Sequence, residues 1–129
     1  LTGNIKKLRK LSEKMGVSDR VILPGFTTNP YPWIKNAELL ALSSDFEGLP
    51  TVLIEAIVCG TKVVSTNCPH GPNEILLGDL SQYLVPPQDA NQLAIAINSA
   101  IKANINLSDA KILGKINAKD VTKSYLTLC

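Results

Sequence analysis

The stretch that decides the fold is DFEGLPTVLIEA, residues 45–56, which follows a short apolar run at 39–42. The apolar run predicts a buried strand, and residues 51–58 have the apolar spacing of a helix. Gly48 and Pro50 separate the two segments, and Pro50 suits the first helical position because proline has no N–H to lose there. We therefore expect a strand, a tight turn and a helix in succession.

Two carboxylates flank this turn, Glu47 at the end of the strand and Glu55 on the helix. The first N–H groups of a helix have no partner within it and favour an anion. A phosphate bound there would lie between two carboxylates that accept hydrogen bonds from hydroxyls, which indicates a sugar nucleotide. The alternative is that neither glutamate binds a ligand, so that Glu47 is simply a charged loop residue and Glu55 a charged residue on the helix surface. Glu55 fits that alternative poorly, because it stands in the apolar run 52–58 and a buried carboxylate needs partners.

Helical and strand-like segments alternate along the rest of the chain. Helices are predicted at 4–15, 31–36 and 51–58, in a short segment that Asn73 caps, after Asp89, and at 108–126. Strands are predicted at 20–23, 38–42, 62–66 and 83–85. The helix after Asp89 has Leu93, Ala94, Ile97 and Ile101 on one face. This alternation predicts an α/β fold, a Rossmann-like parallel sheet with helices on both faces. Ligands bind such sheets at the carboxyl ends of the strands, which here lead into the loops 24–29, 43–50 and 67–73.

Composition narrows the class of protein. The chain has 129 residues, 45% of them hydrophobic, which suits one domain, 1–129, whose residues 106–129 form a C-terminal helical tail. A net charge of +2 is too small to indicate nucleic acid, and no apolar stretch is long enough to span a membrane. We expect no leader, because a polar, basic helix opens the chain. Three cysteines without a CxxC pair favour a reducing cytoplasm, and we expect no metal site.

Four segments in order resemble the nucleotide-sugar half of the family-4 retaining glycosyltransferases of GT-B fold. They are residues 17–26, 44–56, 59–66 and 68–76. The last of them is similar to a bacterial subgroup that builds lipopolysaccharide and other surface glycans. The resemblance covers roughly residues 1–105, and it implies the C-terminal half of a GT-B fold, truncated at its N-terminus.

The resemblance implies a role for individual residues in binding a nucleotide diphosphate sugar, for which we take UDP as the first guess. Glu47 is the predicted catalytic residue, beside the donor sugar and its hydroxyls, and Glu55 accepts hydrogen bonds from the ribose. The remaining predicted contacts are backbone groups that face the diphosphate, at Gly48, Leu49, Thr51 and Val52, and a loop against the nucleobase, at Gly25, Phe26 and Thr27. We expect no cofactor. A divalent metal is not needed if helix N–H groups and basic residues neutralise the diphosphate charge, and the sequence offers no Asp-x-Asp ligand pair.

The implied activity is transfer of the sugar to a glycan or lipid-linked acceptor with retention, in the cytoplasm or peripherally at the inner face of the membrane. The leaving phosphate assists the attack, so Glu47 is not assigned as a nucleophile. The acceptor would bind an N-terminal half that this chain lacks, so we expect no turnover from these residues alone. Two alternatives stay open, a nucleotide-sugar epimerase of GT-B fold and a non-catalytic nucleotide-binding module.

Overall fold

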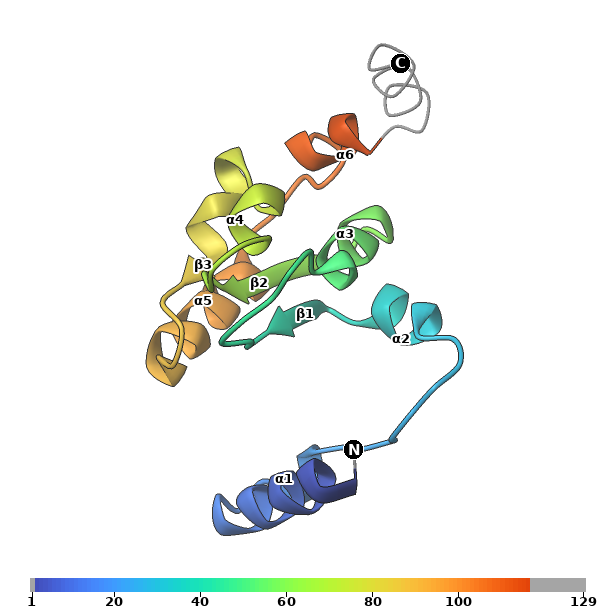
Figure 1. Cartoon of the computed structure of the whole chain (residues 1–129), viewed down its shortest axis with the longest axis vertical. Coiled ribbons are helices and arrows are strands. Elements are labelled where there is room, and N and C mark those ends of the chain that lie inside the picture. Colours follow the sequence, from blue (N-terminus) through green and yellow to red (C-terminus); the bar gives the residue numbers. More distant parts are fainter. Residues whose placement is uncertain (1, 117–129) are drawn as a thin grey trace. The chain divides into compact units, whose positions relative to one another are not determined.

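The computed structural model describes residues 2–116, which fall into two compact units that divide between Pro30 and Tyr31. The first unit contains α1 (Thr2–Lys14) and the 3-10 helix η1 (Ser18–Arg20), both blue in Figure 1. The helix predicted at 4–15 is confirmed. The strand predicted at 20–23 is wrong, because a strand needs a ladder partner and the described part of this unit contains no second strand. Ile22 is accordingly 74% exposed.

The second unit is built on a three-stranded parallel sheet (Figure 1). Its strands are β1 (Leu39–Leu42), β2 (Lys62–Thr66) and β3 (Leu84–Val85), in the order β1-β2-β3. Leu42 lies opposite Ser65, and Ser65 lies opposite Leu84. Parallel strands need crossover connections, so each strand here is separated from the next by helical segments. The predicted α/β class with a parallel sheet is confirmed.

Three helices of this unit begin where the sequence predicts, at residues 31, 51 and 90. The helices of the unit are α2 (Tyr31–Asn36), α3 (Thr51–Val58), α4 (Pro72–Ile75), the 3-10 helix η2 (Gly78–Tyr83), α5 (Ala90–Lys102) and α6 (Lys111–Lys115). Asp89 caps α5, because its Oδ1 accepts a hydrogen bond from the Gln92 N–H at 2.9 Å. Ala94 is exposed, however, whereas Ala96 and Ala100 are buried, so the buried stripe of α5 is turned slightly from the predicted face.

The helix predicted at 108–126 is described only in part. Its described portion is α6, and residues 117–126 lie outside the described residues. The helix begins three residues late because Asn106 makes local hydrogen bonds that compete with helical ones. Its Oδ1 accepts from the Ser108 N–H at 3.2 Å and from the Ser108 Oγ at 2.6 Å.

The core of the second unit surrounds β2. Val63, Val64, Ser65 and Thr66 are all buried, so both faces of this strand are covered. From α3 the core receives Leu53, Ala56 and Ile57, and from α5 it receives Ala96 and Ala100. None of the helices in residues 2–116 has the length and the apolar content to cross a membrane.

Candidate functional site

Three loops of the second unit follow the carboxyl ends of its strands. Residues 43–50 follow β1, residues 67–71 follow β2, and residues 86–89 follow β3. Because the strands are parallel, these ends lie at one edge of the sheet, the edge at which such folds bind ligands. The first loop carries Glu47 and leads into α3, which carries Glu55.

The carboxylate of Glu47 is fixed to the sheet through two hydrogen bonds in series. Its Oε1 accepts from the Ser44 Oγ at 2.6 Å. The carbonyl oxygen of Ser44 in turn accepts from the Oγ1 of Thr66, the last residue of β2. Thr66 is buried and Glu47 is half-buried. The position of Glu47 is therefore set by the central strand and not by its own loop alone.

The turn before α3 leaves several backbone donors unpaired. Pro50 precedes the helix as its N-cap and does not occupy the predicted first helical position, since its carbonyl already accepts from the Leu53 N–H at 3.0 Å. The Thr51 N–H, a predicted diphosphate contact, donates to the Leu49 carbonyl at 2.9 Å. Within residues 2–116, the N–H groups of Gly48, Leu49 and Val52 have no hydrogen-bond partner. These three are available to an anion.

Glu55 lies in the second turn of α3 and is half-buried. Its carboxylate makes neither a hydrogen bond nor an ion pair with any residue in the described range. The acceptor oxygens of this carboxylate therefore remain available for hydrogen bonds.

The loop after β2 packs closely on the turn before α3. Gly71 has φ +85°, and a β-carbon on it would overlap the Gly48 carbonyl oxygen and the Pro50 Cδ. Gly71 also caps α4, with its N–H 3.4 Å from the Glu74 Oε1. The predicted cap, Asn73, is instead the second residue of α4, because Pro72 already fits the first helical position.

An aromatic pair joins the same two loops. The rings of Phe46 and His70 meet edge to face, with centroids 6.5 Å apart and an interplanar angle of 78°. Phe46 is 72% exposed and His70 is also exposed, so the pair lies at the surface beside Glu47. His70 has φ +64°, a left-handed conformation that few residues other than glycine adopt.

The residues predicted to lie against a nucleobase belong to the first unit. Gly25, Phe26 and Thr27 are all exposed, and the side chain of Phe26 is 87% exposed. The Thr27 Oγ1 donates to the Asn29 carbonyl at 3.2 Å. Their role against the base stays a prediction.

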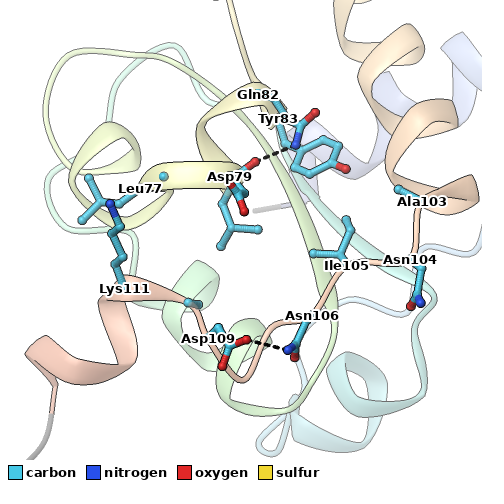
Figure 2. Close-up of a pocket in the computed structure, with 13 residues that line it drawn as sticks. Leu77, Asp79, Gln82, Tyr83, Ala103, Asn104, Ile105, Asn106, Asp109 and Lys111 are labelled. Atoms are coloured by element: carbon cyan, nitrogen blue, oxygen red, sulfur yellow. Dashed lines mark hydrogen bonds between the residues drawn. The ribbon is translucent and has the colours of Figure 1, made fainter.

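A cavity of about 550 Å³ in the second unit lies elsewhere, between η2 and the segment that follows α5 (Figure 2). Two of its polar side chains pair locally, since the Gln82 Nε2 donates to the Asp79 carbonyl and the Asn106 Nδ2 donates to the Asp109 Oδ2, both at 2.7 Å. No buried side-chain polar atom in the described residues lacks a partner. None of the predicted site residues lines this cavity. The candidate site is therefore the loop edge with Glu47.

Sequence reasoning missed the residues that hold the site in place. Ser44, Thr66 and Gly71 orient Glu47 and the turn before α3, yet none of them was predicted as a site residue. Ser44 precedes Glu47 by three residues, a local signal that could have identified it. Thr66 gave no such signal, because it is 22 residues from Ser44.

The family described as glycosyl transferases group 1 matches residues 2–120. The lipopolysaccharide 1,6-galactosyltransferase of Escherichia coli K12 is 28% identical over 128 residues, which is 95% of this chain and 35% of that protein.

Two further relatives extend the comparison. The N-acetylgalactosamine-N,N'-diacetylbacillosaminyl-diphospho-undecaprenol 4-alpha-N-acetylgalactosaminyltransferase of Campylobacter jejuni is 29% identical over 91% of this chain and 32% of its own length. An uncharacterized glycosyltransferase of Methanocaldococcus jannaschii is 39% identical over 61% of this chain and 20% of its own length. The chain thus spans about a third or less of the length of these relatives.

Proposed function

The chain belongs to the glycosyl transferases group 1 family, and from that premise we propose that it is the donor-binding part of a glycosyltransferase. The enzyme would transfer a sugar from a nucleotide diphosphate sugar, with retention, to a glycan or lipid-linked acceptor during synthesis of lipopolysaccharide or another surface polysaccharide. The names of the relatives in Escherichia coli and Campylobacter jejuni support this acceptor class. Turnover is assigned to a longer protein that contains this chain, because the relatives are about three times its length.

The observation that carries the proposal is an anchored carboxylate next to unpaired backbone donors. Glu47 is held through Ser44 by Thr66, and the residues directly after it, Gly48 and Leu49, have free N–H groups. Donors of this kind at a helix start bind phosphate oxygens. A carboxylate that is already oriented accepts hydrogen bonds from sugar hydroxyls with little further loss of side-chain freedom.

Glu55 supplies the second half of the donor contact. Its half-buried carboxylate has no partner within residues 2–116, so we assign it to the hydroxyls of the ribose. The diphosphate would then lie between the two glutamates, against the Gly48, Leu49 and Val52 N–H groups. The Thr51 N–H is left out of this set, because it donates to Leu49.

These residues would act by positioning and by stabilising charge. As the bond between the sugar and the diphosphate breaks, negative charge grows on the departing phosphate, and fixed N–H groups at the start of α3 stabilise it. Glu47 would orient the sugar toward the acceptor. We assign no nucleophile in this chain. A lipid-linked acceptor would bring the whole enzyme to the inner face of a membrane from the cytoplasm.

The proposal is tested by nucleotide binding to the 129-residue chain. Thermal shift and calorimetry with UDP, GDP, ADP and the matching nucleosides should show that one diphosphate stabilises the chain, by about 2.7 kcal/mol at a hundred times its Kd. Glu55→Gln should lower the affinity for that diphosphate. Glu38 is an exposed glutamate before β1, and Glu38→Gln should leave the affinity unchanged. If no diphosphate binds better than its nucleoside, the assignment of this edge to the donor is wrong.

Turnover of the longer protein then separates the transferase from an epimerase. A transferase moves the labelled sugar onto an acceptor and releases a nucleoside diphosphate. An epimerase returns an isomer of the same sugar nucleotide. If the chain binds the diphosphate but the longer protein forms neither of these products, the chain is a non-catalytic nucleotide-binding module.

A further inference from the structure

His70 is the one basic residue in the three loops at the carboxyl edge of the sheet. These loops, residues 43–50, 67–71 and 86–89, otherwise carry the acidic side chains Asp45, Glu47 and Asp89. A diphosphate held by the N–H groups before α3 would bring its own negative charge next to Asp45 and Glu47, which lie in the same loop as those groups. Hydrogen bonds from neutral amides offset that charge only in part, so a further donor at this edge would add affinity.

The structure places the His70 ring against Phe46, which lies in the same loop as those N–H groups. Gly71, the next residue, packs against Gly48, and the ring itself lies edge to face against Phe46. The backbone of His70 is left-handed, which costs free energy and persists where the surrounding structure imposes it. The packing of Gly71 on Gly48 and the contact of the ring with Phe46 thus place His70 beside the 46–48 turn.

Both ring nitrogens of His70 are free of protein partners. Within residues 2–116 the imidazole makes no hydrogen bond and no ion pair, and the side chain is exposed. The nearby Glu74 carboxylate is directed to the Gly71 N–H. An imidazole carries at least one N–H donor in either protonation state, so it offers a hydrogen bond to an oxyanion at any pH.

We propose that His70 donates a ring N–H to an oxygen of the donor's diphosphate, as a binding residue additional to the two glutamates. The inference rests on the proposed function, since it needs the donor to bind at this edge. The rival role is packing alone, with the ring serving only to cover Phe46. The two roles differ in whether the ring nitrogens matter.

Two substitutions separate these roles, with UDP, UMP and uridine as the probes. His70→Asn keeps a residue that tolerates the left-handed backbone, and His70→Phe keeps an aromatic ring beside Phe46. Both substitutions should lower the affinity for UDP by about 10-fold, the effect expected from loss of a charge-assisted hydrogen bond. Both should change the affinity for uridine by less than about 2-fold. The matched control is Gln88→Asn, at the other left-handed residue of this edge, which should change neither.

A second measurement needs no variant. Because the chain has a single histidine, its ring signals in an NMR spectrum belong to His70. They should move on addition of UDP and stay in place with uridine. If UDP binds but leaves them unmoved, or if His70→Phe binds UDP as wild type does, His70 is not a diphosphate ligand and the proposed function still stands. If UDP, GDP and ADP all fail to bind the wild type, both the inference and the proposed function are wrong.

Discussion

Gly71 packs so closely against Gly48 that no side chain fits between them. A β-carbon at residue 71 would overlap the Gly48 carbonyl oxygen, and the φ of +85° disfavours any residue other than glycine. The loop after β2 is therefore seated on the turn that presents the free N–H groups before α3. A substitution at Gly71 should therefore displace these N–H groups, although Gly71 itself is not among the proposed ligand contacts.

Gly71→Ala should lower both the free energy of unfolding and the affinity for the nucleotide diphosphate. The left-handed backbone alone costs an alanine about 1–2 kcal/mol, and relief of the overlap must displace the turn at Gly48 as well. We expect more than about 2 kcal/mol of destabilisation in urea unfolding, with diphosphate binding weakened by about 10-fold or more.

Gly60→Ala is the matched control for this prediction. Gly60 has φ +79°, but nothing lies within 4 Å of the position that its β-carbon would take. Gly60→Ala should therefore cost about 1–2 kcal/mol through backbone strain only and leave the diphosphate affinity unchanged. Equal losses of affinity in the two variants would show that the contact between Gly71 and Gly48 has no part in shaping the site.

Thr66→Val should loosen the Glu47 loop while it keeps the shape of the core. The substitution removes the hydroxyl that donates to the Ser44 carbonyl, at a cost of about 1 kcal/mol, and should weaken donor binding several-fold. Thr61→Val removes a comparable buried hydrogen bond, from the Thr61 Oγ1 to the Ile34 carbonyl at 2.7 Å. Thr61 lies before β2, away from the loops, so its variant should lose stability only. The test measures the donor affinity and the free energy of unfolding of both variants. Equal donor affinities in the two variants would contradict the prediction.

Local signals were enough to predict most elements of the second unit. The segments 31–36, 51–58 and 62–66 have the exact bounds of α2, α3 and β2, because apolar spacing and flanking Gly or Pro act within a few residues. The strand expected at 20–23 failed for the opposite reason. Its β-branched residues favour an extended chain, but only a partner strand turns an extended chain into a sheet.

In the candidate site, too, features set by nearby residues could be predicted and features set by distant segments could not. Glu47 and Glu55 could be identified from their places around a strand-to-helix turn, which is a local pattern. The packing of Gly71 on Gly48 and the hydrogen bond from Thr66 join segments more than 20 residues apart, and nothing in the sequence pattern relates them. The free carboxylate of Glu55 likewise depends on which side chains fail to reach it in the folded chain.

Asp89→Ala should destabilise α5 without changing the affinity for the donor. Removal of the cap that accepts from the Gln92 N–H costs about 1 kcal/mol in the free energy of unfolding. Asp89→Asn, which keeps an acceptor oxygen, should recover most of it. Chemical denaturation of the three proteins tests the order, and an Asn variant as unstable as the Ala variant would show that the charge and not the cap stabilises the helix.

Ser44→Ala should impair catalysis more than stability. The Ser44 hydroxyl holds the Glu47 carboxylate at 2.6 Å, and without it the side chain samples orientations in which it cannot meet the sugar. In the longer enzyme we expect kcat to fall by about 10-fold, with unfolding shifted by less than about 1 kcal/mol because the hydroxyl is only half-buried.

Ser43→Ala, at the exposed neighbouring serine, is the control and should behave as wild type. Because Ser44 is proposed to act only through Glu47, the two substitutions should not add. In a Glu47→Ala background, which removes the acceptor of the Ser44 hydroxyl, Ser44→Ala should therefore lower kcat by less than about 2-fold. Full additivity in this double-mutant cycle would mean that Ser44 meets the substrate by itself, and that Glu47 is oriented by something other than its link to the end of β2.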